Sequence, residues 1–268
     1  MPRHHAHSGT MQELARDITT AQSLVVLSGA GMGLASGIAT FRGSDPGAVW
    51  ANDVMTMGTF AFFREDPVES WRWYRSRFRS LQGALPNAGH HALVALERWA
   101  VASGRDFLLV TQNIDTLHRK AGSERLVEVH GRADRVRCPR VGCEHGSPRG
   151  SLPVPDFTTF DASPSQDTLP RCPACGTVVR AHVLWFDEFY DGHEEYQFRR
   201  VLSAFTRADL ILAVGTSFAV GVTEAALRTR AAKWTIDPSS NRPPYGVRQW
   251  SAPQEEALPA LVAALAAQ

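Results

Sequence analysis

Short, continuous runs of apolar residues alternate along this chain with longer segments whose apolar residues recur every three or four positions. The continuous runs predict strands at SLVVLSGAG from Ser23, FLLVTQN (Phe107 to Asn113), LILAVGTS (Leu210 to Ser217) and Ala231 to Ser240. The periodic segments, such as Met11 to Ala21 and HHALVALERWA, predict helices. Because apolar strands separated by helices are typical of a parallel sheet buried on both faces, the pattern predicts an α/β fold with a Rossmann-like sheet.

Glycine and polar residues gather at the end of each predicted strand. Gly29 to Gly33 follow the first strand, Gln112 to Asp115 and Gly215 to Ser217 end the next two, and Asp237 ends the fourth. Open parallel sheets bind ligands in the crevice beyond the carboxyl ends of their strands. We therefore expect these four groups to converge on one binding crevice.

The pattern breaks between the second and third predicted strands. Residues 138 to 175 are rich in proline and serine and hold the chain's four cysteines as a C-x4-C and a C-x2-C pair: Cys138, Cys143, Cys172 and Cys175. Four thiolates on two tight turns can enclose one tetrahedral Zn²⁺ with no open position, so the predicted site is structural. Four unligated thiols are the alternative, and His145 is a second candidate for the place of Cys143. The segment is predicted to be a small module in which zinc replaces a hydrophobic core.

Composition and charge narrow the class of protein. With 268 residues, 44% of them hydrophobic, the chain can bury a large core, which argues against disorder. Its 28 lysines and arginines nearly balance its 27 aspartates and glutamates. The net charge of the chain therefore does not favour binding to nucleic acid or to an anionic membrane. The N-terminal MPRHHAHSGT lacks the apolar core of a secretory signal, and no stretch has the ~20 apolar residues of a membrane span. A soluble cytoplasmic protein is expected.

Local positive charge is concentrated in WRWYRSRFRS, residues 71 to 80. The preceding Asp66-Pro67 predicts a helix start, which makes this decad amphipathic. The aromatic Trp71, Trp73 and Phe78 are predicted to lie in the core, and Arg72, Arg75 and Arg79 in water. Tyr74 and Arg77, three residues apart, share one helix face. A buried arginine in a cleft needs an anionic partner, which is either a ligand or a carboxylate of the protein such as Glu69 or Asp66.

The order of several motifs resembles that of the sirtuin family of NAD-dependent protein deacylases. These are GAGMGLASGIATFR from Gly29, TQNID (Thr111 to Asp115), VHG (Val129 to Gly131), the paired cysteines, VLWFDE (Val183 to Glu188) and GTS (Gly215 to Ser217). The resemblance runs from Leu24 to the terminal LPALVAAL. It implies one catalytic domain over 1–268, with a large NAD domain at 11–133 and 178–268. The small domain would combine the zinc module, about 134–177, with a helical part, about 43–85.

The resemblance implies that NAD is a co-substrate held by a defined set of residues. The pyrophosphate and nicotinamide ribose would contact Gly29, Ala30, Gly31, Met32, Gly33, Thr40, Phe41 and Arg42. The ribose and carboxamide would be positioned by Gln112, Asn113 and Asp115. The adenosine end would lie near Gly215, Thr216, Ser217, Asp237 and Gln254. This chain has Gly33 where the family usually has serine, and Asp237 where it usually has asparagine. A carboxylate at Asp237 would accept from ribose hydroxyls and repel a 2′-phosphate, which predicts NAD over NADP.

The resemblance also implies the catalytic residues. His130 in VHG is expected to be the general base on the ribose hydroxyls, since imidazole titrates near neutrality. Asn113 and Asp115 would assist it, and His118 is expected to orient their loop. The implied products are free lysine, nicotinamide and O-acyl-ADP-ribose. A protein ADP-ribosyltransferase or NAD glycohydrolase on the same fold is the alternative, and a non-catalytic binding module is the third hypothesis.

Two segments are expected to contact an acyl-lysine peptide. Strand edges would pair with its backbone through Val183, Trp185, Phe186, Asp187 and Glu188 on one side and Phe218 to Val220 on the other. An ordinary core strand is the alternative for the first segment. The Y-x-x-R of Tyr74 and Arg77 resembles the sirtuin subgroup that prefers malonyl-, succinyl- and glutaryl-lysine. There a phenol and a planar guanidinium hold the distal carboxylate, so acidic acyl groups are expected, with acetyl also accepted.

Overall fold

The chain folds around two sheets in a computed structural model that describes residues 9–40, 54–239 and 242–267. The strands are β1 (Ser23–Ser28), β2 (Asp106–Thr111), β3 (Leu126–Glu128), β4 (Gly131–Arg137), β5 (Leu152–Pro153), β6 (Arg180–Val183), β7 (Leu210–Val214), β8 (Ala232–Ile236) and β9 (Val247–Trp250). The α-helices are α1 (Met11–Thr20), α2 (Val54–Met57), α3 (Phe60–Glu65), α4 (Pro67–Arg79), α5 (Ala88–Ala102), α6 (Leu117–Ala121), α7 (Thr158–Ala162), α8 (Phe198–Arg207), α9 (Gly221–Leu227) and α10 (Gln254–Ala266). Three 3₁₀ segments are η1 (Ala30–Ser36), η2 (Tyr190–Gly192) and η3 (Glu194–Tyr196).

The larger sheet has six parallel strands in the order β3-β2-β1-β7-β8-β9. This confirms the predicted α/β class and the four predicted strands. The order reverses between β1 and β7, which is the switch point where ligands of such sheets bind. β3 and β9 were not predicted, because β3 has only three residues and half of the VRQW of β9 is polar.

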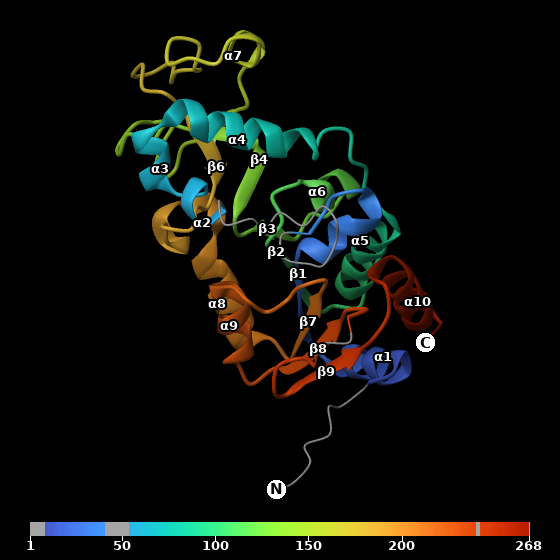
Figure 1. The fold of residues 1–268 in the computed structure, drawn as a ribbon. Helices are drawn as coiled ribbons and strands as arrows, with labels where there is room; N and C mark the ends of the chain where they lie inside the picture. The colour runs from blue at the N-terminus through green and yellow to red at the C-terminus, as the bar shows by residue number, and fades with distance from the viewer. Residues whose placement is uncertain (1–8, 41–53, 240–241, 268) are drawn as a thin grey trace, which may run out of the picture.

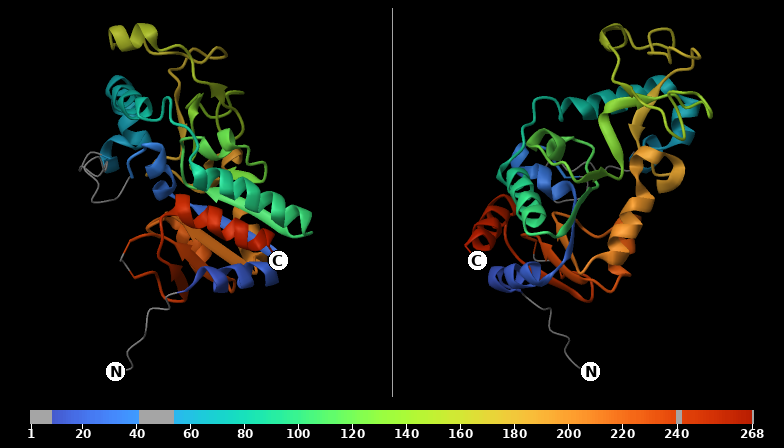
Figure 2. Two further views of the ribbon diagram at one scale, coloured as in Figure 1. Left: turned by 90° about the vertical axis from the view of Figure 1, so that its right-hand side faces the viewer. Right: turned by 180° about the vertical axis from the view of Figure 1, so that it is seen from behind.

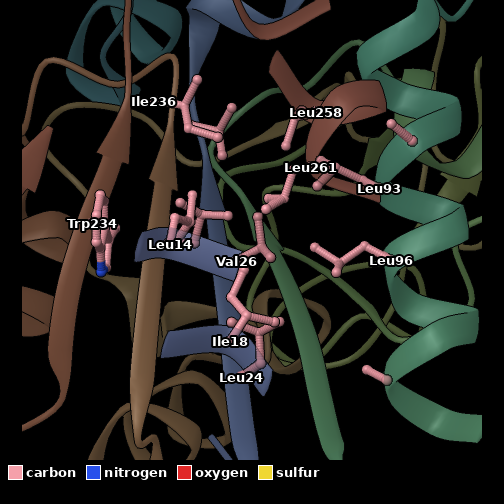
Figure 3. Packing of buried hydrophobic residues seen from close by; sticks show 14 of the residues in the cluster. Leu14, Ile18, Leu24, Val26, Leu93, Leu96, Trp234, Ile236, Leu258 and Leu261 are labelled. Carbon is pink, nitrogen blue, oxygen red and sulfur yellow. The ribbon is translucent and has the colours of Figure 1, made fainter. Parts of the chain in front are cut away.

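Helices cover both faces of this sheet. Along β1, Leu24 and Val26 point to one face and Val25 and Leu27 to the other, as the two-residue period of a strand requires. The first pair packs with α1, α5 and α10, and Figure 3 shows leucines of these helices around Val26. The second pair packs with α8 and α9, which lie on the opposite side in Figure 1. Both faces are therefore apolar, which explains the continuous hydrophobic runs in the sequence.

The smaller sheet, β5-β4-β6, is antiparallel and packs with α3, α4 and α7 around a separate core. In Figure 2 this part lies beyond one end of the parallel sheet. The small sheet begins at Gly131 and ends at Val183, because β6 pairs with β4, and so extends to either side of the predicted module at about 134–177. The start of α4 is as predicted, since Pro67 is its first residue and the Asp66 side chain accepts from Glu69 N–H.

The helices that the structure describes include none with the length and apolar character to cross a bilayer.

Candidate active site

The glycine turn after β1 packs directly onto the turn after β7. Gly29 N–H donates to Val214 O at 3.0 Å, and Gly31 N–H donates to Gly215 O at 2.9 Å. A Cβ atom on Gly31 would lie 2.8 Å from Gly215 Cα, so only glycine allows the two turns to approach this closely. The predicted convergence of these strand ends is therefore observed.

Gln112 and Asn113 tie the end of β2 to both turns. Gln112 Nε2 donates to Ser28 O and to Thr216 Oγ1, each at 3.1 Å. Asn113 Nδ2 donates to Gly29 O at 2.9 Å. These amides join the carboxyl ends of β1, β2 and β7. Along the joined ends Ala30 is partly exposed and Ser217 is exposed.

Other predicted cofactor residues differ in their accessibility. The Met32 side chain lies in the hydrophobic core, so only its backbone is available to a ligand. Asn87, which the sequence analysis missed, fixes this turn by donating to Met32 O at 2.8 Å and to Ser36 Oγ at 3.0 Å. Gly33 and Thr40 are buried. The predicted ligands Phe41 and Arg42 lie outside the described residues.

At the adenosine end, Asp237 follows β8 and Gln254 begins α10. Asp237 Oδ1 accepts from Ser239 N–H at 2.8 Å. Gln254 is buried, and its backbone oxygen lies near Gly89 at the start of α5. Both residues thus flank the same edge of the sheet as the glycine turns.

Asp115 shapes the loop after β2. Its Oδ1 accepts from Leu117 N–H at 2.8 Å, across Thr116, whose φ of 66° is left-handed. Burial raises the pKa of Asp115 above its ordinary value. His118, one turn on, bonds through Nε2 to Ser28 Oγ at 2.9 Å and packs on His90, which fits its predicted role in orienting the loop.

His130 lies between the two sheets, immediately before β4. Its Nδ1 is 2.8 Å from Gln112 O, and its own carbonyl accepts from Leu184 N–H at 2.8 Å. Gly131 follows with a φ of 79°, and a Cβ there would lie 2.2 Å from His182 O, so glycine is required at this position. Burial lowers the pKa of His130 to about 4, so the imidazole is neutral at pH 7.

Tyr190 is a site residue that the sequence analysis missed. Its hydroxyl lies 3.0 Å from His130 Nε2, and its ring stacks on Phe198 with centroids 4.4 Å apart. No spacing pattern marks it, because it enters the site from a short 3₁₀ segment 60 residues after His130.

The four cysteine sulfurs come together as predicted. Cys138 Sγ lies 3.5 Å from Cys175 Sγ, and Cys143 Sγ lies 3.6 Å from Cys172 Sγ. All four lie within 4.8 Å of one another. A tetrahedral zinc with Zn–S bonds of about 2.3 Å separates its sulfurs by about 3.8 Å, so the cluster fits one structural zinc. His145 instead lies beside Glu144, with Nε2 3.4 Å from its carboxylate.

The segment from Val183 to Glu188 begins at the end of β6, which is an edge strand of the small sheet. Val183 pairs with Gly131 of β4, and Phe186 N–H donates to Gly58 O at 3.1 Å. The Trp185 ring is buried in the small-domain core. Pairing of this segment with a peptide backbone stays a prediction.

The two carboxylates of this segment have partners within the protein. Asp187 accepts from Phe60 and Ala61 N–H at 2.7 and 3.0 Å and so caps α3. Glu188 pairs with the buried Arg180 and with Arg137. Burial would raise the pKa of Glu188, but these guanidinium charges hold it below its ordinary value.

The second predicted edge, Phe218 to Val220, is not a regular strand. Phe218 has a φ of 56°, which is the left-handed region and cannot continue a β ladder. Val220 precedes α9 and packs on the core shared with α8. In this conformation only the backbone of Val220 is extended.

On α4 the side chains of the basic decad, residues 71 to 80, are not all buried or exposed as predicted. Tyr74 is buried and stacks on Trp185 with centroids 5.8 Å apart, while the partly exposed Arg77 lies 3.9 Å above the Trp73 ring. Arg75 is not in water: its Nε donates to Asp161 Oδ1 at 3.1 Å and so joins α4 to α7.

A second group of residues that could bind a metal ion is His182, on β6, with His193 and Glu195. His182 Nε2 lies 3.0 Å from Glu195 Oε2. Both ring nitrogens of His193 have partners, since Nε2 bonds to Gly150 O and Nδ1 accepts from Glu195 N–H. His182 Nδ1 is buried and has no hydrogen-bond partner among the described residues.

Comparison with known proteins agrees with this site. A model of the Sir2 family matches residues 29–222. An NAD-dependent protein deacylase of Thermus thermophilus is 39% identical over 208 residues, which cover 77% of this chain and 74% of that protein. The mitochondrial NAD-dependent protein deacylase sirtuin-5 of the dog is 35% identical over 229 residues, covering 80% of this chain and 70% of that protein.

A solved structure of a Sir2 homologue in complex with NAD superposes with a TM-score of 0.79. It is 30% identical in sequence, and the match covers 98% of this chain and 97% of that one. The fold and the cluster of four cysteines therefore agree with those of Sir2 proteins. The chain belongs to the Sir2 family of NAD-dependent protein deacylases.

Proposed function

We propose that this protein removes acyl groups from lysine side chains with consumption of NAD, and that nicotinamide and O-acyl-ADP-ribose are released. The observation that carries the proposal is His130 at the crevice formed by the glycine turns. Its Nδ1 is held by Gln112 O, so the lone pair of the neutral imidazole is on Nε2, beside the Tyr190 hydroxyl. NAD supplies a cationic leaving group, nicotinamide, and the ribose carbon that the acyl oxygen attacks.

The chain's own residues perform the remaining tasks. Gln112 and Asn113 fix the loop against the glycine turns, so the crevice does not have to reorganise. His130 takes the proton of a ribose hydroxyl on Nε2. Asp115, buried at the start of α6, keeps this loop in its bent form.

We further propose that acidic acyl groups, such as succinyl and malonyl, are preferred over acetyl. Arg77 is fixed on the Trp73 ring, and Tyr74 remains a neutral hydroxyl because burial raises its pKa. A phenol and a guanidinium on one helix face suit a carboxylate. Of the carboxylates considered as protein partners of Arg77, Glu69 pairs with Arg72, and Asp66 caps α4. The similarity to dog sirtuin-5 agrees with this preference.

The substrates are proposed to be acylated proteins or peptides in the cytoplasm. Product analysis tests the reaction: the protein is incubated with NAD⁺ and acetyl- or succinyl-lysine peptides, and the products are identified by mass spectrometry. Peptide-dependent O-acyl-ADP-ribose is expected, and His130→Ala should reduce its formation by about 10²–10⁴-fold. ADP-ribosylated protein or peptide-independent ADP-ribose would instead indicate a transferase or glycohydrolase, and unchanged NAD⁺ would contradict catalysis.

A further inference from the structure

Both ring nitrogens of His130 are occupied by groups of the protein itself. A carbonyl oxygen only accepts hydrogen bonds, so Nδ1, 2.8 Å from Gln112 O, carries the proton. Nε2 therefore carries the lone pair, and the Tyr190 hydroxyl 3.0 Å away donates to it. The atom expected to act as the base is thus already bonded to a phenol.

Tyr190 is held in this place by its own contacts. Its ring stacks on Phe198 at an interplanar angle of 18°, and its oxygen lies 3.4 Å from the N–H of Val222 in the first turn of α9. Burial raises the pKa of Tyr190, so the phenol keeps its proton at neutral pH. The donor is therefore neutral and fixed in direction.

We propose that Tyr190 is a positioning residue. Its hydroxyl donates a hydrogen bond to His130 Nε2 before NAD binds, and a ribose hydroxyl of the cofactor then replaces it as the donor. The inference rests on the proposed function, because it requires the ribose to reach Nε2. An imidazole nitrogen has one lone pair in the ring plane, so it accepts from the phenol or from the ribose hydroxyl, not from both in full strength.

This exchange has a measurable consequence for cofactor binding. The resting hydrogen bond stabilises the unliganded enzyme and must be broken when the ribose binds. A single neutral hydrogen bond of this kind changes an equilibrium by about two- to tenfold. Tyr190 therefore keeps the His130 imidazole aligned before NAD binds, and it weakens NAD binding by about two- to tenfold.

Tyr190→Phe is the variant that tests the proposal, because it removes the hydroxyl and keeps the ring on Phe198. Tyr196→Phe is the matched control: it removes a buried hydroxyl that has no hydrogen-bond partner among the described residues. The first readout is the ¹⁵N spectrum of the His130 imidazole at pH 7 without cofactor. In Tyr190→Phe the Nε2 resonance should move downfield, as for a lone pair without a donor, while Nδ1 stays protonated. Tyr196→Phe should leave both resonances in place.

The second readout is a calorimetric titration with NAD⁺ in the absence of peptide. Tyr190→Phe should bind NAD⁺ about two- to tenfold more tightly than the wild type. An unchanged Nε2 resonance, or unchanged or weaker NAD⁺ binding by Tyr190→Phe, would overturn the proposal while the proposed function stands. If the wild type binds no NAD⁺, the proposed function fails, and the exchange fails with it, although the altered Nε2 resonance would still establish the resting hydrogen bond.

Discussion

The close contact between Gly31 and Gly215 sets the shape of the crevice at the glycine turn after β1. Gly31 and Gly215 approach each other so closely that a methyl group has no place between them. The same turn accepts hydrogen bonds from Asn113 and Asn87, so a shift there would be transmitted to the catalytic loop. Close backbone approach is thus the physical reason for glycine at this point.

Gly31→Ala is therefore expected to impair cofactor binding. The added methyl carbon would lie 2.8 Å from Gly215 Cα, and both contacting groups are backbone, so the turns must separate. Overpacking of this kind costs about 1–3 kcal/mol, which should appear as a lower Tm and a loss of roughly tenfold or more in NAD⁺ affinity by calorimetry. Gly192→Ala, whose Cβ meets nothing within 4 Å, is the control and should change neither quantity. Equal behaviour of the two variants would contradict this role for Gly31.

At the scale of elements, the site depends on how the small domain is attached. β6 pairs with β4 directly after His130, and α4 is joined to α7 through Arg75 and Asp161. The two cysteine pairs lie in the same domain, and the core around Trp185 includes Cys138 and Cys172. Loss of zinc should therefore disturb β4, which follows His130, and α4, which carries Tyr74 and Arg77.

Removal of zinc is expected to destabilise this domain. A closed four-sulfur site contributes folding free energy outright, so a strong chelator should lower Tm and release one zinc per chain. Cys172→Ser should reproduce the effect, and adding zinc back should restore only the chelated wild type. Metal analysis and thermal unfolding measure both outcomes. A protein that unfolds at the same temperature with and without its metal would contradict a structural zinc.

The elements differ in how far the sequence predicts them. Four of the six strands of the parallel sheet and the cysteine pairs were predicted, because continuous apolar runs and metal-ligand spacing are local signals. The side-chain contacts of the Val183 to Glu188 segment were not predicted. Its acidic residue Glu188 is bound by Arg180, a buried arginine that no local pattern marks, and such partners are fixed only by the tertiary fold. Tyr190 was missed for the same reason.

At the scale of the whole molecule, buried neutral histidines link stability to pH. Burial lowers the pKa of His90, His130 and His193 to about 4, and burial also lowers the pKa of His118 and His182. In the unfolded chain these groups titrate near pH 6.5. The unfolded state therefore binds more protons between pH 6.5 and 4.

The free energy of unfolding should accordingly fall as the pH is lowered from 6.5 to 5. Each additional proton bound by the unfolded chain contributes a slope of about 1.4 kcal/mol per pH unit, and more than one proton is expected. The carboxylates with lowered pKa, such as Glu195 at about 2, lose their contribution only at lower pH. Urea unfolding at several pH values measures the slope. A constant free energy of unfolding from pH 7 to pH 5 would be inconsistent with neutral buried histidines.

The central claim is that this Sir2-family crevice deacylates lysine with a preference for acidic acyl groups, and kcat/KM on matched peptides tests it most directly. The wild type should form O-acyl-ADP-ribose with a higher kcat/KM on succinyl- than on acetyl-lysine. Arg77→Met should reduce the succinyl value by about tenfold or more and the acetyl value far less, because a charge-assisted hydrogen bond is lost only with the carboxylate. Arg72→Met, on the same helix but paired with Glu69, should change neither. Equal losses on both peptides in Arg77→Met would contradict the account.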